Sequence, residues 1–271
     1  MMLRKRCVLI REICANVAAN LPSYWPLLKS VPKQHTPSQR GQLKALIIDS
    51  AGNNIGLTHW KTAFGLQARG ATIVRYYPDQ VPVGRRNGEQ AHEAIPQIVQ
   101  WPHKLGETKY LDQPAPLTLD NLLILYGGYC PYTGFPLRRR TNDMRYQASL
   151  EHILPTSRGG AHSFSNVVPA ASAINTAKDN YTPWEIGLPL ACRYPGVPTQ
   201  RDLIDFAAEV TFFAHHPHLR QRGPSEKIHL WMKQLEVGLS GLPTLWQNRY
   251  RSYGHVPRGY TLEDLYCGDL E

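Results

Sequence analysis

Apolar and polar positions follow patterns that predict a strand, a helix and a second strand early in the chain. The apolar run from Ala45 to Asp49 predicts a strand, with a turn after it at residues 50–54. Apolar residues then recur at helical spacing, with Thr58 as the N-cap: Trp60, Ala63, Phe64 and Leu66. Gly70 ends this helix, and residues 71–77 predict the second strand.

The next stretch, residues 78–116, is rich in proline and in polar residues. Its helical pattern is weak and is confined to residues 90–101. This composition predicts an irregular connection between the first strands and the rest of the chain.

A helix, two short strands and another helix are predicted in the middle of the chain. Residues 117–125 have the pattern of the first helix. The run 150–154 predicts a strand, and a loop rich in glycine and serine follows it. Val167 and Val168 predict the partner strand, and the small residues at 170–178 predict the second helix.

The remainder of the chain is predicted to be helical. Thr182 to Glu185 has the form of a helix start, with Thr182 as the N-cap, and Trp184 is expected to pack against the two strands. A proline-rich break at 189–198 follows. Beyond it, residues 199–271 carry apolar side chains on helical faces, as at residues 202–213.

Charge points to a polyanionic partner. The 271 residues have a net charge of +9 and a pI near 9.4, with 42% hydrophobic residues, enough for a core. Residues 1–44 hold eight Lys or Arg and one acidic residue, and a basic arm and linker are predicted at residues 1–43. The positive excess lies within the first 200 residues.

The five cysteines are scattered and form no C-x-x-C pair, so neither a disulfide framework nor a four-cysteine zinc site is expected. A reducing cytoplasm is the simplest compartment for such a chain. No apolar run approaches the ~20 residues that cross a bilayer, so no membrane partner is expected.

Three polar residues near the two central strands have the chemistry of a hydrolytic metal site. The predicted strands and helix would bring Glu151, His152 and Asn175 together. A carboxylate and an amide oxygen are hard ligands that suit Mg²⁺ and leave positions open for water and phosphate. A neutral imidazole, with an ordinary pKa near ~6.5, can take a proton from water.

This segment resembles an HNH nuclease motif of the ββα-metal type, in its His-Asn-Asn version. The resemblance implies that Glu151 and Asn175 bind the metal and that His152 activates water. It implies that Asn166 ties the loop together and orients the histidine. The Arg158-Gly159-Gly160 sequence and Lys178 also fit the family pattern.

Residues 44–77 resemble, more weakly, the strand-helix-strand unit that precedes the nuclease in many stand-alone bacterial and phage HNH proteins. Many relatives also hold a structural zinc with two cysteine pairs. Here Cys130 is kept, but Thr133, Ala171 and Ile174 stand at the other three positions. No structural zinc is therefore expected, and Phe135, Leu137 and Ile174 would pack this turn.

Basic residues close to the motif are candidates for phosphate contact, which gives affinity without sequence choice. The predicted nucleic-acid-binding residues are Arg138, Arg139, Arg140, Arg145, Arg158 and Lys178.

The predicted fold is α+β. It comprises a basic arm and linker at 1–43, a strand-helix-strand region with an irregular connection at 44–116, an HNH core at 117–198 and a helical region at 199–271. The predicted function is Mg²⁺-dependent hydrolysis of DNA, most simply duplex DNA, with Mn²⁺ as a possible substitute and a homodimer as a possible assembly. Two alternatives stay open: a non-catalytic nucleic-acid-binding or assembly protein with the same fold, and RNA as the substrate.

Overall fold

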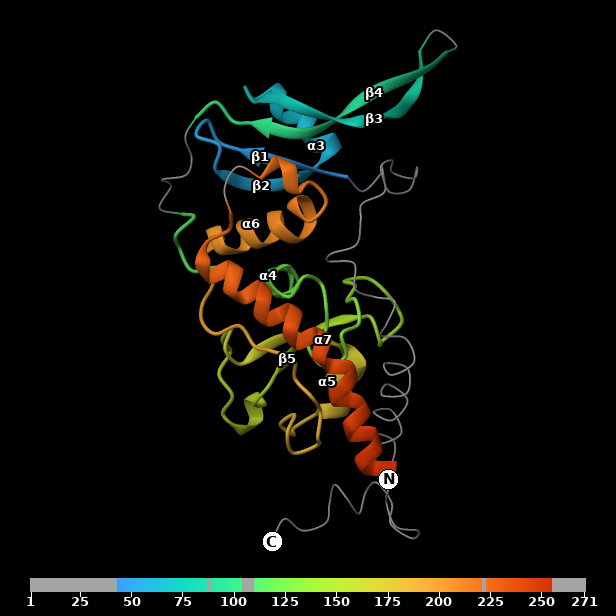
Figure 1. Ribbon diagram of the computed structural model, residues 1–271, viewed down its shortest axis with the longest axis vertical. Helices are drawn as coiled ribbons and strands as arrows, with labels where there is room; N and C mark the ends of the chain where they lie inside the picture. Colours follow the sequence, from blue (N-terminus) through green and yellow to red (C-terminus); the bar gives the residue numbers. More distant parts are fainter. Residues whose placement is uncertain (1–42, 87–88, 104–109, 221–222, 255–271) are drawn as a thin grey trace. The chain divides into compact units, whose positions relative to one another are not determined.

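The structure is a computed structural model that describes residues 43–86, 89–103, 110–220 and 223–254 (Figure 1). Its mixture of helices and strands confirms the predicted α+β class. The basic arm and linker predicted at 1–43 lie, except for Leu43, outside the described residues. The described part of the chain divides into two compact units, one with residues 115–198 and 226–254 and one with residues 43–114 and 199–225.

The centre of the first unit is an antiparallel pair of strands followed by a helix. Strand β5 (Ala148–His152) pairs with β6 (Val167–Ala171), and helix α5 (Ser172–Lys178) follows β6 directly. All five residues of β6 are buried, which accounts for its small and β-branched side chains. The two predicted strands and the helix therefore form, with β5 two residues earlier than the predicted 150–154 and α5 starting two residues later than the predicted 170.

Helix α4 (Leu119–Leu125) precedes this hairpin. It begins after Thr118, whose hydroxyl oxygen accepts a hydrogen bond from the Asn121 N–H at 3.2 Å. Leu122 and Leu125 are fully buried. The predicted helix at 117–125 therefore forms, two residues shorter at its start.

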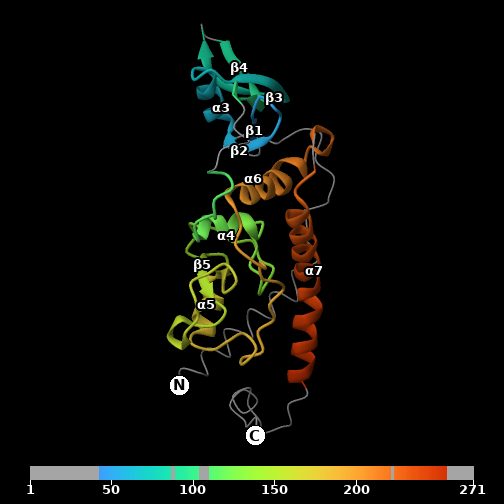
Figure 2. The same ribbon diagram turned by 90° about the vertical axis from the view of Figure 1, so that its left-hand side faces the viewer.

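A long helix, α7 (Glu226–Gly254), completes the first unit and lies beside it in both views (Figures 1 and 2). The Trp231 side chain is buried, and its Nε1 donates to the Leu125 carbonyl oxygen at 2.7 Å. Its ring stands edge-on to Tyr126 and Tyr194, at centroid distances of 5.3 and 5.1 Å. This aromatic cluster anchors the first turns of α7.

Residues 182–185 do not start a helix. The Glu185 carboxylate accepts hydrogen bonds from the Thr182 N–H and hydroxyl at 2.6 and 2.7 Å, so the capping contacts form. The chain nevertheless leaves after one turn, where Gly187 takes a positive φ of 66°. Trp184 is 65% exposed, so the prediction that it packs against the strands is wrong.

The second unit is a four-stranded sheet with the order β2-β1-β4-β3. Strand β1 (Lys44–Ile48) pairs antiparallel with β2 (Asn54–His59), a strand that the sequence did not predict. Helix α3 (Trp60–Gln67) then begins after His59, whose Nδ1 accepts from the Lys61 N–H at 3.2 Å, so the N-cap is His59 and not Thr58. Trp60 buries its side chain in a cluster with Leu43, Tyr77 and Ile95.

The irregular connection predicted at 78–116 is wrong for most of its length. Strands β3 (Thr72–Arg86) and β4 (Glu89–Gln100) form a long antiparallel hairpin (Figure 1). Prolines are tolerated there because β3 is an edge strand and because the register shifts between Tyr76 and Gln80 and after Pro82. The weak helical pattern at 90–101 belongs to β4, whose residues Ile95 and Val99 are fully buried.

Helix α6 (Gln200–Ala208) covers this sheet and continues as one π-helical turn, η3 (Glu209–Phe213). Thr199 and Asp202 form a complete capping box at its start. Residues from α6 and η3 pack against β1 in one cluster: Leu46, Ile48, Ala208, Phe212 and Phe213. The apolar face predicted at 202–213 therefore packs against the sheet. A short 3₁₀ turn, η4 (Pro217–Leu219), follows η3.

Candidate active site

The two acid-base candidates lie at the end of β5. Glu151 is 2% exposed, whereas His152 is half-buried and ends the strand. In the hairpin register Glu151 faces Val168 and His152 faces Val167, both fully buried. The strand therefore holds a carboxylate inside the fold and an imidazole at its edge.

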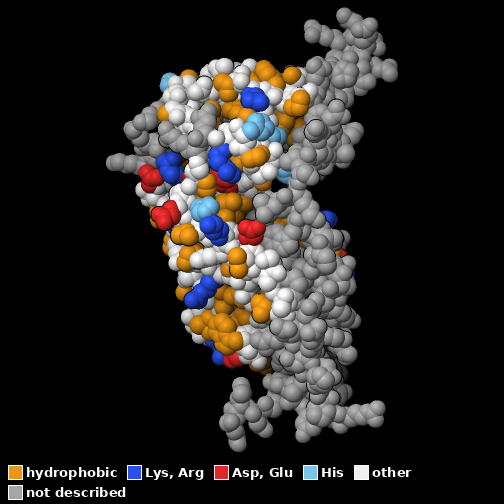
Figure 3. Space-filling view, viewed as in Figure 1, with side chains coloured by type: hydrophobic (Ala, Val, Ile, Leu, Met, Phe, Trp, Pro, Cys, Tyr) orange, Lys and Arg blue, Asp and Glu red, His pale blue; other side chains and the backbone are white. Residues whose placement is uncertain are grey.

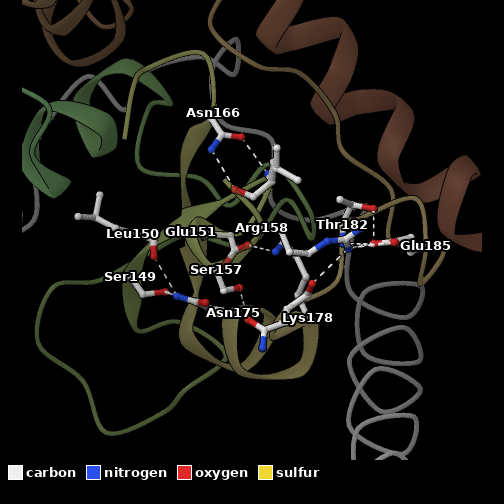
Figure 4. Close-up of polar contacts among 12 residues, drawn as sticks. Ser149, Leu150, Glu151, Ser157, Arg158, Asn166, Asn175, Lys178, Thr182 and Glu185 are labelled. Atoms are coloured by element: carbon white, nitrogen blue, oxygen red, sulfur yellow. Dashed lines mark hydrogen bonds and ion pairs between the residues drawn. The ribbon is translucent and has the colours of Figure 1, made fainter. Parts of the chain in front are cut away.

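Asn175, on α5, is oriented by hydrogen bonds to β5 (Figure 4). Its Nδ2 donates to the Leu150 carbonyl oxygen at 2.9 Å and to the Ser149 hydroxyl at 3.2 Å. Both amide protons are then engaged, and the amide oxygen Oδ1 is left as the group that can accept or coordinate. Helix and strand are joined through this side chain, so the oxygen has a fixed direction.

Glu151 and Lys178 form an ion pair in the interior. The Lys178 Nζ and the Glu151 Oε1 are 2.6 Å apart, and the side chains are 1% and 3% exposed (Figure 4). Burial raises the pKa of Glu151 to about 7, and the lysine opposes that rise. Lys178 was predicted to contact phosphate, but here its ammonium is a cation held against the candidate metal-binding carboxylate.

Asn166 closes the loop between the two strands. Its Oδ1 accepts from the Leu154 N–H at 2.9 Å, and its Nδ2 donates to the carbonyl oxygens of Leu154 and Ala161 at 3.0 and 2.9 Å. Its own carbonyl accepts from the Ile153 N–H at 2.8 Å. These bonds fix the chain directly after His152.

Isosteric replacement of Asn166 by aspartate tests this arrangement. A carboxylate offers no donor, so it would set oxygen against the carbonyls of Leu154 and Ala161. We expect a loss of about 2–4 kcal/mol in the free energy of unfolding, measured by chemical denaturation. The exposed Asn142→Asp variant, with the same charge change, should stay near wild type; equal losses in both variants would contradict the role of the loop bonds.

The two glycines after Arg158 are required by backbone geometry. The short 3₁₀ turn η2 (Thr156–Arg158) ends at Gly159, which has a positive φ of 84°. A Cβ on Gly160 would lie 1.8 Å from the Leu154 carbonyl oxygen, too close for any side chain. The Gly-Gly pair therefore lets the loop fold tightly back onto the end of β5.

His162 lies beside His152, and the sequence prediction missed it. The Nε2 of His152 and the Nδ1 of His162 are 3.1 Å apart, and the ring centroids are 5.3 Å apart. Burial, followed by the charges of His162 and Lys178, lowers the pKa of His152, so its imidazole is neutral at pH 7. The sequence offered one signal for this contact, a second histidine within the glycine-rich loop.

Arg158, predicted to bind nucleic acid, is engaged within the protein (Figure 4). Its Nη1 lies 2.6 Å from the Glu185 Oε2 and 3.3 Å from the Asn180 carbonyl oxygen. This pairing, followed by the hydrogen bonds from Thr182, lowers the pKa of Glu185 to about 2. Arg158 thus ties the active-site loop to the turn at 182–185.

The arginines before β5 lie at the surface. Arg139 pairs with Asp120 at 3.1 Å, and Arg145 pairs with Asp143 at 2.6 Å. Arg138 lies over the Tyr146 ring at 5.8 Å from its centroid, and Arg140 is exposed. Among the described residues on the face in Figure 3, Lys and Arg side chains are scattered singly among other types.

The turn that carries a structural zinc in many relatives is closed here by hydrogen bonds. The Cys130 carbonyl accepts from the Gly134 N–H at 2.7 Å, and the Thr133 hydroxyl oxygen accepts from the Phe135 N–H at 3.2 Å. Ala171 and Ile174, at the other two ligand positions, are each 1% exposed. Phe135 and Ile174 are buried as predicted, and Leu137 is half-buried.

A zinc chelator should therefore leave the unfolding temperature unchanged. Apolar packing and backbone hydrogen bonds, rather than a metal, hold the turn in this prediction. Thermal unfolding with and without the chelator measures the effect, together with metal analysis of the purified protein. One equivalent of zinc and a lower unfolding temperature in chelator would contradict the prediction.

The residues at the strand end fit a magnesium ion. Glu151 and Asn175 offer a carboxylate and an amide oxygen, both hard donors of the kind that Mg²⁺ prefers. The Lys178 ammonium lies 2.6 Å from the Glu151 Oε1, so a metal ion would have to share this carboxylate with it or displace it. Within the described residues no group of three or more His, Cys, Asp or Glu side chains could hold a metal ion.

An antiparallel hairpin and a helix place a carboxylate, a histidine and an amide on neighbouring elements, the arrangement that the resemblance to HNH nucleases implies. In the comparison with protein families, residues 130–184 match the family model described as HNH endonuclease. This segment therefore belongs to the HNH endonuclease family, as the sequence predicted, and the family indicates a nuclease-type function. No curated protein and no solved structure matches the chain.

Within the part of the chain that the structure describes, no helix combines the length and the apolar character that crossing a membrane demands.

Proposed function

We propose that this chain is a Mg²⁺-dependent endonuclease that hydrolyses phosphodiester bonds of duplex DNA, one strand per active site. The observation that carries the proposal is the placement of three groups around one hairpin and helix. These are the buried Glu151 carboxylate, the oriented Asn175 Oδ1 and the neutral His152 imidazole.

In the proposed reaction, Glu151 and Asn175 would hold the metal. A bound Mg²⁺ supplies charge neutralisation at the scissile phosphate and at the departing 3′ oxygen. His152 removes a proton from the attacking water, and Asn166 keeps the backbone after His152 in place. The products carry 5′-phosphate and 3′-hydroxyl ends. His152 is suited to this task because its pKa lies below its ordinary value, so the base form is present at neutral pH.

The choice of DNA rests on charge and position. The net charge of +9 favours a polyanion. The exposed segment with Arg138, Arg139, Arg140 and Arg145 directly precedes β5 and therefore the site. Contacts from these side chains to phosphate would give affinity that falls with salt and does not depend on base sequence.

Nicking of supercoiled plasmid DNA tests the proposal. The protein should convert plasmid to the open circular form with Mg²⁺ or Mn²⁺, and EDTA should stop the conversion. Structured RNA, added as a competitor and as a labelled substrate, distinguishes the nucleic acid that is cut. Absence of cleavage with either metal on either nucleic acid would refute the nuclease proposal.

One observation favours a second function, binding of nucleic acid without cleavage. The Glu151 carboxylate is paired with Lys178 inside the fold, so it has a cation without any metal. Under this alternative the same protein would shift DNA in a gel with a strong salt dependence and would leave the plasmid intact with every divalent metal.

A further inference from the structure

His162 stands where it can control the candidate general base. The Nδ1 of His162 and the Nε2 of His152 are within hydrogen-bonding distance, at 3.1 Å, and the two rings are tilted by 37°. His162 lies in the loop between β5 and β6, two residues beyond Gly160. The contact thus joins the end of the strand to the loop that follows it.

Hydrogen bonds within the loop, and not the contact between His162 and His152, hold the backbone around His162. The Gly160 N–H donates to the Pro155 carbonyl at 3.0 Å, and the Asn166 Nδ2 donates to the Ala161 carbonyl at 2.9 Å. The Ser163 N–H also bonds to the Ala161 carbonyl, at 3.1 Å. Because hydrogen bonds fix the peptides on both sides, a change to the His162 side chain should leave the loop in place.

Imidazole chemistry decides the direction of the hydrogen bond. A neutral imidazole carries one N–H donor and one acceptor nitrogen. The Nε2 of His152 is engaged with His162. If His152 removes a proton from water, it must therefore use Nδ1, and Nδ1 must hold a lone pair. Nε2 must then carry the hydrogen and donate it to His162.

We propose that His162 is a positioning residue, whose Nδ1 accepts a hydrogen bond from the Nε2–H of His152 and thereby selects the tautomer that can act as a base. This inference rests on the proposed nuclease function. The proton from water moves to Nδ1 of His152, the water oxygen bonds to phosphorus, and the bond between phosphorus and the 3′ oxygen breaks. The 3′ oxygen leaves and takes a proton from solvent. His162 gains and loses no proton, and its bond strengthens when His152 becomes a cation.

Two substitutions of His162 separate the hydrogen bond from the shape of the side chain. His162→Asn keeps an acceptor, because the Asn Oδ1 stands the same number of bonds from Cβ as the His Nδ1. His162→Leu fills similar space without any acceptor. We expect kcat for nicking to fall by about 10–100-fold in His162→Leu with KM unchanged, and to stay within about 3-fold of wild type in His162→Asn.

A spectroscopic readout tests the tautomer directly. In ¹⁵N-labelled protein without metal, the His152 ring should show hydrogen on Nε2 in the wild type and in His162→Asn. In His162→Leu it should show a mixture of tautomers. A purely structural role would lower the unfolding temperature of both variants and leave the nitrogen shifts of His152 unchanged, which would overturn the inference.

The outcomes also distinguish this inference from the proposed function. An active wild type, an inactive His152→Ala variant and a fully active His162→Leu variant would overturn the role of His162 and leave the nuclease standing. A wild type that cuts no nucleic acid would overturn the nuclease proposal and, with it, the positioning role.

Discussion

Replacing His152 with alanine is expected to lower the nicking rate by about 10²–10⁴-fold, the usual contribution of a positioned general base. The imidazole is half-buried at the end of β5, and its lowered pKa keeps it neutral at pH 7. The loop between β5 and β6 holds one other histidine, His162, and its ring contacts the His152 ring. The rate is measured on supercoiled plasmid at saturating Mg²⁺.

DNA binding should survive in the same variant, because the exposed arginines of 138–145 are untouched. Gel shifts in EDTA check binding, and thermal unfolding checks the fold. His229→Ala removes an exposed histidine of α7 in the same unit and is the matched control, with activity expected near wild type. A His152→Ala variant that cuts within a few fold of wild type would assign the base to another residue.

The elements that carry the candidate active site were predictable because their signals are local. Apolar runs mark β5 and β6, and small residues mark α5, with turn-forming residues between the strands. The predicted family is confirmed over residues 130–184 for the same reason, since its motif lies within one continuous segment.

The long hairpin of the second unit shows why the prediction failed elsewhere. Prolines at positions 78, 82 and 96 indicate a break when the sequence is taken alone. Pairing between Tyr76 and Pro96, with shifts of register around it, absorbs these residues in β3 and β4. Such pairing is a property of two chain segments together, so a single segment does not show it.

The ion-pair partners of the charged side chains could likewise not be predicted from the sequence. Arg158 pairs with Glu185, 27 residues away in the sequence, and Lys178 pairs with Glu151 across the hairpin and helix. Their position within the motif predicts phosphate contact for both residues. These residues are instead paired within the protein, because the fold brings a carboxylate to 2.6 Å from Arg158 and from Lys178.

The second large predicted effect is a loss of stability when the buried ion pair between Glu151 and Lys178 is broken. Lys178→Met, which keeps the length of the side chain and removes its charge, should destabilise the protein by about 3–5 kcal/mol, the usual cost of leaving one member of a buried pair alone. The Glu151→Gln/Lys178→Met double variant, which removes both charges, should recover most of that loss. Chemical denaturation without metal measures the three proteins.

The loss should depend on pH with a defined sign. The pKa of Glu151 is raised by burial from its ordinary value of 4.5 to about 7, and removal of the lysine raises it further. A carboxyl with a raised pKa contributes stability that is fully present below 4.5 and is lost as pH increases through the folded-state pKa. The deficit of Lys178→Met relative to wild type should therefore be small near pH 5 and largest at pH 8.

Magnesium should partly replace the lost ammonium. In the wild type Mg²⁺ and the Lys178 ammonium compete for the Glu151 carboxylate, whereas in Lys178→Met the carboxylate has no such partner. We expect Mg²⁺ to raise the unfolding temperature of Lys178→Met more than that of wild type, and to leave the double variant unchanged, because ligand binding to the folded state stabilises it. Equal shifts in all three proteins would mean that the metal binds away from Glu151, and the assignment of this carboxylate as a metal ligand would fail.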